Sequence, residues 1–594
     1  MTSAETLSKI FFEFSYRDAM LGVPFKPRAY ELASESVSAL KGDVEDAWRA
    51  GGIKALMDLP GIGKHMAEKI DEFFRTGKIK EYAKMRKEFP VDIWGLAQIE
   101  GLGPKHILEM YQRLKVKDLD GLKRAIAKHQ LRDIPRWGEK SEAKIAKALD
   151  LMEKASGRKL LGDVLPVAEA IIATLSKIKG VKRCAVAGSI RRMQETVGDI
   201  DLLVTTTDPK TAMDTFVNLP DVQAVHEKGK TRSSVRLSMG IDADLRVVPD
   251  NVYGATLQYF TGDKRHNVLV REYALSKGYS LNEYGLFRLN RRSVGARRPP
   301  KDGQAAVPLR NGLVACKTEE DIYRALGMDT PPPEIRTGGD EIEAAKKHAL
   351  PDLLPYGSVK GDLQVQTSWT DGSASIEEMA KAAKKAGLSY LAVTDHTRSL
   401  AFINGLDDAR VAKQGKEIDA LNKKLKGFTV FSGTECDIRK DGSLDLSDKT
   451  LSKLDWVGVS VHSSFSLSRA EQTARIVKAI SNPHVDCLFH PTCRIIGKRE
   501  PIDLDMDEVI AACKKHRVAL EIDCYPDRSD LRDLHVRMAV NAGVSLAIDT
   551  DAHSPDHFRF IRLGEAIARR GWATKADVLN TKNARQLLAY LAKK

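Results

Sequence analysis

The chain has 594 residues, too many for one hydrophobic core, and this length predicts several domains. Its formal net charge is +13 and its Lys and Arg residues are spread along the chain, which favours a polyanionic partner such as nucleic acid. No apolar run reaches the roughly 18 residues of a membrane span, so we expect a soluble, intracellular protein with no membrane partner. The seven cysteines form no Cys-x-x-Cys pair, which argues against a disulfide framework or a thiolate zinc site.

The first 153 residues have apolar positions at helical spacing, interrupted by two similar glycine turns. Residues 59–64 contain Gly-Ile-Gly-Lys, and residues 99–105 contain Gly-Leu-Gly-Pro-Lys. In a turn of this type between two helices, backbone N–H groups face a phosphate. One such turn could be a simple tight loop, whereas two indicate non-specific binding to duplex DNA. The expected contact residues are Gly61, Gly63, Lys64, Gly101, Gly103 and Lys105. Residues 134–140 are a candidate third copy.

The pattern changes after residue 154 to a helix followed by strands that carry three carboxylates. Asp199 and Asp201 are two residues apart, so on a strand they project from one face, and Asp244 closes the cluster from another strand. Carboxylates placed in this way can share two divalent cations, as nucleotidyl transfer requires. The backbone of Gly188 and Ser189, with Arg192, would hold a triphosphate. A lone Asp-x-Asp would be interpreted as a surface turn, but the preceding Gly-Ser turn and the third Asp favour catalysis.

Beyond residue 356, short apolar strands alternate with helical stretches. This rhythm predicts a parallel β/α barrel with functional residues at the C-terminal strand ends. The residues that follow the strands include His396, Glu435, His462, His490, Asp551 and His553. So many ligand-type residues at strand ends indicate a polynuclear Zn²⁺ or Mn²⁺ site, which would generate hydroxide and hydrolyse a phosphate ester.

Taken together, residues 1–330 resemble the X family of DNA polymerases, of the DNA polymerase beta type. The whole chain resembles the bacterial form with a C-terminal PHP (polymerase and histidinol phosphatase) domain. The resemblance implies a multidomain fold with α-helical helix-hairpin-helix domains, an α/β nucleotidyltransferase palm, an α+β thumb and a (β/α)7-type barrel. The expected domains are a lyase-like DNA-binding domain (1–85), fingers (86–153), palm (154–249), thumb (250–330), linker (331–355) and PHP phosphoesterase domain (356–594).

The resemblance assigns Asp199, Asp201 and Asp244 as catalytic ligands of Mg²⁺ or Mn²⁺. The residues implied to hold the incoming nucleotide are Gly188, Ser189, Arg192, Gly198, Tyr259, Phe260, Gly262, Asn267 and Arg271. Packing of the Tyr259–Phe260 segment on the sugar would leave no room for a 2′-hydroxyl. Asn267 and Arg271 would face the minor-groove side of the nascent base pair, where shape is tested without reading sequence.

A segment around Lys69 resembles the part of the family that bears the Schiff-base lysine of a 5′-deoxyribose-phosphate lyase. A helical lysine near other cations can attack the aldehyde of an abasic site. Lys26 and Tyr30 fall where contacts to a 5′-phosphate are expected. Phe25 and His65, however, replace a histidine and a lysine of lyase-active relatives. We therefore expect 5′-phosphate binding at a gap, and lyase chemistry stays open.

The PHP resemblance implies three metal positions. Their ligand sets are Asp371, His396 and His553 for the first, Glu435, His462 and His490 for the second, and the bridging Glu435 with Asp551 for the third. The third position should also take two histidines from the first strand, where this chain has Gln364 and Gln366. Because an amide oxygen is a poorer zinc ligand than imidazole, we expect the third metal to be weak or absent.

The leading hypothesis is a DNA-directed DNA polymerase that fills short gaps in base excision repair, with a weakened 3′→5′ exonuclease or 3′-end-processing PHP domain. An alternative makes the PHP domain an inactive structural or DNA-binding module. A template-independent or RNA-directed nucleotidyltransferase disagrees with the paired glycine turns, and a small-molecule phosphoesterase leaves the N-terminal half unexplained. The expected partners are gapped duplex DNA and dNTPs, and we expect a cytoplasmic, nucleoid-associated monomer.

Overall fold

The computed structural model describes residues 3–40, 43–57, 59, 62–99, 101–155, 157–289, 312–400 and 403–592. The chain forms two compact units. One comprises residues 1–156 with 497–499, and the other comprises residues 157–496 with 500–594. Within the described ranges, no helix combines the length and apolar character needed to cross a membrane.

The first unit is helical and has two separate apolar cores. One core, around Leu7, Phe11 and Phe14, belongs to its first half, and the other, around Ile107 and Met110, to its second half. Its helices are α1 (Ser3–Met20), α2 (Lys26–Leu40), α3 (Asp43–Met57), α4 (Lys64–Thr76), α5 (Lys80–Glu88), α6 (Ile93–Ala97), α7 (Pro104–Leu114), α8 (Leu119–Ala127), η1 (Gln130–Asp133) and α9 (Glu139–Ala155).

The predicted glycine turns lie between helices of this unit. Gly63 is the residue before the first turn of α4, and Gly103 has the same place before α7. Gly101 has a φ of 91°, a conformation that favours glycine. Gly61 lies outside the described residues. The helix–turn–helix arrangement predicted for both segments is present.

The second unit begins with the palm, a five-stranded sheet in the order β2-β4-β7-β6-β5. Even-numbered residues of β4, such as Ile200 and Leu202, pack in the main core with α10, while Leu203 packs on the opposite face with Tyr253. Alternation therefore leaves Asp199 and Asp201 on the Leu203 face. The elements are β1 (Lys159–Leu160), α10 (Leu161–Ser176), β2 (Val181–Val186), α11 (Gly188–Arg191), β3 (Thr196–Val197), β4 (Asp199–Thr206), α12 (Pro209–Val217), β5 (Val222–Lys228), β6 (Arg232–Leu237) and β7 (Asp242–Val247).

The thumb region follows and packs around Ile322 and Tyr323. Its elements are η2 (Asp250–Val252), α13 (Tyr253–Thr261), α14 (Lys264–Ser276), β8 (Tyr279–Asn282), β9 (Gly285–Arg288), β10 (Leu313–Ala315), α15 (Glu319–Ala325), η3 (Pro333–Ile335) and α16 (Asp340–Lys346). The stretch expected as a linker contains η3 and α16, and its Ile342 joins the thumb core. This stretch is therefore packed rather than exposed along its length.

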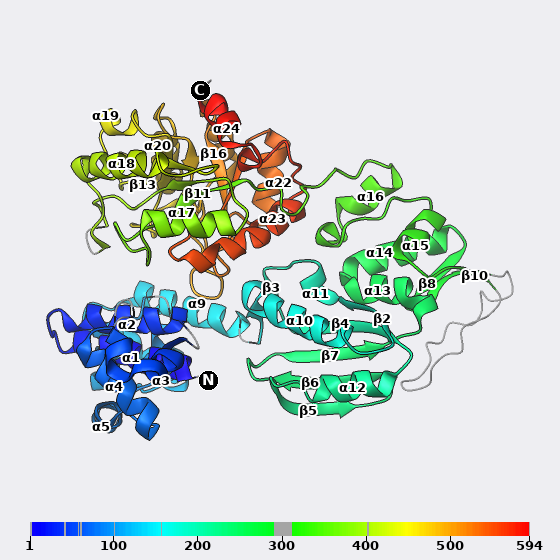
Figure 1. The fold of residues 1–594 in the computed structure, drawn as a ribbon, viewed down its shortest axis with the longest axis horizontal. Helices are drawn as coiled ribbons and strands as arrows, with labels where there is room; N and C mark the ends of the chain where they lie inside the picture. Colours follow the sequence, from blue (N-terminus) through cyan, green and yellow to red (C-terminus); the bar gives the residue numbers. More distant parts are fainter. Residues whose placement is uncertain are drawn as a thin grey trace. The chain divides into compact units, whose positions relative to one another are not determined.

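The C-terminal part is the predicted parallel barrel, with seven strands in sequential order and helices around them (Figure 1). Backbone bonds between Gln366 and Ala552 close it, because the segment after the last strand pairs with the first strand. Its elements are β11 (Gly361–Val365), α17 (Ile376–Lys385), β12 (Tyr390–Val393), α18 (Asp408–Asn422), β13 (Thr429–Asp437), α19 (Asp448–Leu451), β14 (Trp456–Ser460), α20 (Arg469–Ile480), β15 (Cys487–Leu488), α21 (Met506–His516), β16 (Ala519–Asp523), α22 (Asp533–Ala542), β17 (Leu546–Asp549), η5 (Pro555–Phe560), α23 (Ile561–Arg570), η6 (Leu579–Thr581) and α24 (Ala584–Leu591).

A buried ion-pair network joins the thumb to the palm. Glu319 accepts hydrogen bonds from Arg191 Nη2 and Arg336 Nη1, both at 2.5 Å, and the side chain of Arg336 is only 1% exposed. Burial alone would raise the pKa of Glu319, but the charges and hydrogen bonds of the two arginines lower it to about 2. The carboxylate is therefore held in its charged form.

We predict that Glu319→Gln destabilises the second unit at neutral pH. A folded-state pKa depressed from 4.5 to about 2 stabilises the native state above pH 4.5, and this stabilisation is lost as the pH falls toward 2. The loss at pH 7 should be roughly 3 kcal/mol. Urea unfolding at a series of pH values measures the free energy of unfolding. The difference in this free energy between the variant and the parent should become smaller below pH 4.5. The control Glu320→Gln changes an exposed neighbour and should behave like the parent.

Candidate active sites

The three palm carboxylates share one face of the sheet beside the glycine turn. In the parallel pairing of β4 with β7, Asp201 lies opposite Asp244, and Asp199 is two residues before Asp201. Gly188 begins α11 with a φ of 59°, and a Cβ at that position would lie 2.5 Å from Asp201 Oδ2. A side chain would therefore displace the carboxylate, which explains why glycine occupies the turn.

The palm site carries an excess of negative charge. Burial, followed by the charges of Asp199 and Asp244, raises the pKa of Asp201 to about 6. Arg232 pairs with the third carboxylate, because its Nη2 lies 3.1 Å from Asp244 Oδ2. Such like-charge crowding is relieved when divalent cations bind between the carboxylates.

The residues predicted to hold the nucleotide come together from two segments. Arg192 Nη1 donates to the carbonyl oxygen of Thr261, next to Gly262 with its φ of 70°. Ser189 lies in α11, and Gly198 directly precedes the first catalytic carboxylate. The end of α13 thus lies against the glycine turn, as the two motifs require.

Asn267 and Arg271 lie on α14, and Asn267 is more enclosed than predicted. Its side chain accepts from Gln258 Nε2 at 2.8 Å and donates to the carbonyl oxygen of Tyr259 at 2.7 Å. In this structure the amide therefore holds the Tyr259–Phe260 segment instead of presenting itself to a base pair. Tyr259 is 37% exposed, and Arg246 lies over the ring of Phe260.

The predicted DNA contacts of the first unit divide into exposed and buried residues. Lys26, Gly63, Lys64, Gly101 and Lys105 are exposed, and Gly103 is partly exposed. Tyr30 is buried, and its ring centre lies 5.1 Å from that of Phe14. The ring of Tyr30 is thus part of the core, which sequence periodicity could not distinguish from a surface contact.

Lys69, the candidate Schiff-base lysine, is held by an acidic partner. Its ammonium group forms a hydrogen-bonded ion pair with Glu81, which also lies 3.5 Å from Arg17. The Lys69 side chain is 11% exposed and lies over the ring of Phe14. An ammonium engaged in this way has no free electron pair with which to attack an aldehyde.

The barrel brings the predicted metal ligands together at one rim. Asp371, His396 and His553 offer ligand atoms that all lie within 4.8 Å of one another, as expected for the first metal. A second group of this kind consists of His396, Glu435 and His462. These are the groups of three or more ligand-type residues found in the described part of the chain.

Glu435 is the centre of the second group. Its carboxylate lies 3.2 Å from His462 Nε2, 2.8 Å from His490 Nε2 and 3.3 Å from His396 Nδ1. Burial would raise the pKa of Glu435, but the surrounding histidines lower it well below its usual value. Despite burial, Glu435 and Asp437 raise the pKa of His462 to about 9.

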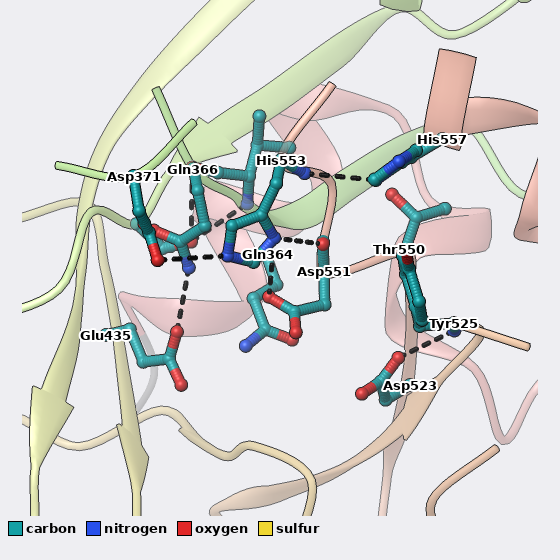
Figure 2. Close-up of polar contacts among 12 residues, drawn as sticks. Gln364, Gln366, Asp371, Glu435, Asp523, Tyr525, Thr550, Asp551, His553 and His557 are labelled. Atoms are coloured by element: carbon teal, nitrogen blue, oxygen red, sulfur yellow. Dashed lines mark hydrogen bonds and ion pairs between the residues drawn. The ribbon is translucent and has the colours of Figure 1, made fainter. Parts of the chain in front are cut away.

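Gln364, on β11, and Gln366, just after its end, face this site (Figure 2). Gln366 Nε2 donates to Glu435 Oε2 at 2.7 Å, so an amide hydrogen occupies one oxygen of the carboxylate that was predicted to bridge metals. Gln364 is fully buried, and neither of its amide atoms has a hydrogen-bond partner among the described residues. Asp551 Oδ1 is likewise buried without a hydrogen bond there.

Two charged residues of the barrel site were missed by the sequence analysis. Asp437 Oδ1 lies 3.2 Å from His462 Nδ1 and would orient that imidazole toward a metal. Arg528 lies 3.7 Å from Asp551 and 3.6 Å from Asp523. The position of Asp437 two residues after Glu435 on a strand was the one available signal, because it places both side chains on the same face.

The donor chemistry fits divalent cations at both sites. Clustered carboxylates in the palm suit Mg²⁺ or Mn²⁺, and mixed imidazole and carboxylate donors in the barrel suit Zn²⁺ or Mn²⁺. Asp551 Oδ1, buried without a hydrogen bond among the described residues, and the crowded charges around Asp201 agree with this chemistry. The third barrel position fits less well, because the amides of Gln364 and Gln366 stand where imidazole donors were expected.

Comparison with known families matches the two helical regions of the first unit, the thumb and the barrel. Models for a helix-hairpin-helix domain and a SAM-like helix-hairpin-helix tandem match residues 4–79 and 95–150. A DNA polymerase beta thumb model matches residues 256–337, and a PHP domain model matches residues 362–523.

The DNA polymerase/3′-5′ exonuclease PolX of Bacillus subtilis (strain 168) is 34% identical over 96% of this chain and 95% of its own length. The chain belongs to the PolX family. Two proteins named "Probable phosphatase" match a smaller part. That of Thermoanaerobacter sp. (strain X514) is 32% identical over 35% of this chain and 84% of its own length. The protein from Caldicellulosiruptor bescii is 27% identical over 30% of this chain and 73% of its own length. The domain content is therefore that of a family X DNA polymerase with a C-terminal PHP domain.

Lyase chemistry in this PolX member should be limited by Glu81. We predict that Glu81→Gln raises the yield of borohydride-trapped adduct with 5′-deoxyribose-phosphate DNA severalfold, because the amine is freed from its ion pair. The matched control Glu88→Gln removes the exposed ion pair with Lys84 and should leave the yield unchanged. Lys69→Ala should abolish the adduct. If it does, equal adduct yields in Glu81→Gln and the parent would contradict the prediction.

Proposed function

We propose that this protein is a DNA-directed DNA polymerase that fills short gaps in DNA repair. The observation that carries the proposal is the pairing of Asp201 with Asp244 on adjacent strands, next to the Gly188 turn that a side chain would block. Divalent cations bound there would activate the primer 3′-hydroxyl and neutralise the leaving pyrophosphate. Family membership and the matched thumb support the same conclusion.

The residues around the carboxylates have separate roles in this proposal. Ser189 and Arg192 bind the triphosphate oxygens, and Gly198 lets the chain pass close to them. Tyr259, Phe260 and Gly262 pack against the deoxyribose. Asn267 and Arg271 face the nascent base pair after the Asn267 amide has exchanged its present partners for the substrate.

The first unit would hold the DNA through its phosphates. The two helix-hairpin-helix turns present backbone N–H groups and exposed lysines, which give affinity without sequence preference and with a strong dependence on salt. Lys26, exposed at the start of α2, is the proposed contact for the 5′-phosphate of a gap. The substrates are thus gapped duplex DNA and dNTPs, and we propose that the protein acts as a monomer in the cytoplasm.

The barrel is proposed to remove nucleotides from 3′ ends, with weakened activity. Two groups of metal-ligand residues are assembled. Gln366, however, donates a hydrogen bond to Glu435, the carboxylate that would also bind a third cation. The assembled histidines favour a catalytic barrel over the inactive module that the glutamines alone would suggest. Asp437 would keep His462 in the tautomer needed for metal binding.

The polymerase assignment is tested on a one-nucleotide gap, with and without dNTPs. We predict that Asp201→Ala lowers the rate of insertion by roughly three orders of magnitude, because the transition state is stabilised almost entirely by metal-held charge. The exposed Asp221→Ala serves as a control and should retain parental synthesis. Near-normal gap filling by Asp201→Ala would refute the assignment.

The effect of having glutamine at positions 364 and 366 is tested by replacing both residues with histidine. We predict that Gln364→His/Gln366→His raises both metal content and 3′→5′ hydrolysis, because imidazole is the stronger donor and the other ligands are already in place. Metal analysis of the dialysed protein and a 3′-labelled primer assay measure the two effects. Full exonuclease activity in the parent, lost in His462→Ala and unchanged in the restored variant, would show that a third metal is unnecessary.

A further inference from the structure

Two residues that follow the nucleotide-binding turn, Met193 and Glu195, contact the barrel. Arg570 Nη1 donates to the carbonyl oxygen of Met193, and Arg494 Nη2 donates to Glu195 Oε1 at 2.6 Å. Arg570 Nη2 also lies 3.6 Å from Glu195 Oε1. Both arginines belong to the barrel, and Met193 and Glu195 belong to the palm, so the carboxylate of Glu195 contacts two arginines across the boundary between these two domains.

These contacts are buried and the barrel fixes them. The side chains of Arg570, Arg494 and Glu195 are 2%, 7% and 20% exposed. Arg494 Nε donates to the carbonyl oxygen of Arg528 at 2.9 Å, and Arg570 Nε donates to Asp533 Oδ2 at 3.2 Å. An exposed ion pair would contribute little, but loss of one member of a buried pair leaves the other charge uncompensated.

Glu195 is also joined directly to the turn. Gln194 N donates to the carbonyl oxygen of Ser189 at 3.0 Å, and Leu161 N donates to that of Glu195 at 2.9 Å. Any displacement of Glu195 would therefore be transmitted through Gln194 to Ser189, the proposed triphosphate ligand. The short helix α11 has only four residues and cannot hold this position by its own hydrogen bonds.

The opposite side of the turn is anchored independently. Arg191 pairs with Glu319 of the thumb, and Arg192 donates to Thr261 at the end of α13. Arg191 and Arg192, at the end of the turn, are thus held by the thumb region, and the residues that follow them are held by the barrel. The start of the turn is fixed by Ala187 N, which donates to the Asp201 carbonyl oxygen at 2.8 Å, so without the barrel contacts the segment after Arg192 would lose its anchor.

We propose that Glu195 is a positioning residue through which the PHP barrel sets the affinity of the palm for the incoming dNTP. This inference rests on the proposed polymerase function and adds to it a role for the barrel that needs no hydrolysis. Arg494 lies four residues after the metal ligand His490, and Cys493 N donates to the His490 carbonyl oxygen at 2.9 Å. One loop therefore serves both sites.

The test is single-nucleotide insertion on gapped DNA by the full chain, with KM for dNTP and kcat determined separately. Glu195→Ala should raise KM roughly ten- to a hundredfold, the order of loss caused by small misplacement of a positioning group. We expect kcat and the affinity for gapped DNA to change little. Glu195→Asp, which keeps the charge, should recover part of the loss.

The matched control is Glu169→Ala. Glu169 forms an ion pair with Arg562 and so joins the same palm and barrel, but both side chains are about half exposed and neither contacts the turn. The KM of Glu169→Ala for dNTP should equal that of the parent. If Glu195→Ala fails to fold by circular dichroism, Glu195→Gln must show the same rise in KM.

An unchanged KM in folded Glu195→Ala, or in Glu195→Gln where the alanine variant does not fold, would overturn the inference. An equal rise in Glu169→Ala would also overturn it, because general loosening of the two domains would then explain the effect. The proposed function is judged separately by the parent and Asp201→Ala. Absence of synthesis in the parent would reject the polymerase itself, whereas synthesis with no effect of Glu195 rejects the positioning role alone.

Discussion

The cost of holding carboxylates in partly or fully buried positions on paired strands is the constraint on which both candidate active sites depend. In the palm, the register of β4 and β7 places Asp201 beside Asp244, and burial with these like charges raises the pKa of Asp201 to about 6. In the barrel, Glu435 is fully buried and remains charged because three histidines surround it. In the palm, divalent cations would relieve the repulsion between the carboxylates. In the barrel, the histidines already offset the charge of Glu435, and bound metal ions would take the place of those contacts.

The sequence predicted the parts of these sites that depend on local periodicity. The spacing of Asp199 and Asp201 defines a strand face, and the strand-end positions of His396 and Glu435 define a barrel rim. Contacts between distant segments were not predictable in the same way. The bond between Asn267 and the Tyr259 carbonyl, like the burial of Tyr30's ring, depends on packing that periodicity does not encode.

The glycine turn shows why a motif is not a site by itself. Four helical residues make few hydrogen bonds of their own; Ser189, a proposed triphosphate ligand, is one of them, and Arg192 follows directly. Buried ion pairs hold this segment and the residues after it, with Glu319 on the thumb side and Glu195 on the barrel side. Because a buried ion pair is costly to leave half-formed, these contacts define one geometry more effectively than they add stability.

Gln364, on β11, and Gln366, just after it, affect the chemistry of the barrel but not its backbone closure. Closure of the barrel uses backbone bonds of Gln364 and Gln366 to Ala552, which do not depend on the side chain. The Gln366 amide also donates to Glu435, so it offsets part of the negative charge that a cation would otherwise neutralise. Backbone closure of the barrel is therefore compatible with amide side chains at these two positions. Arg494 and the buried contacts to the palm lie outside this strand, so the proposed support of the barrel for nucleotide binding does not depend on the side chains of Gln364 and Gln366.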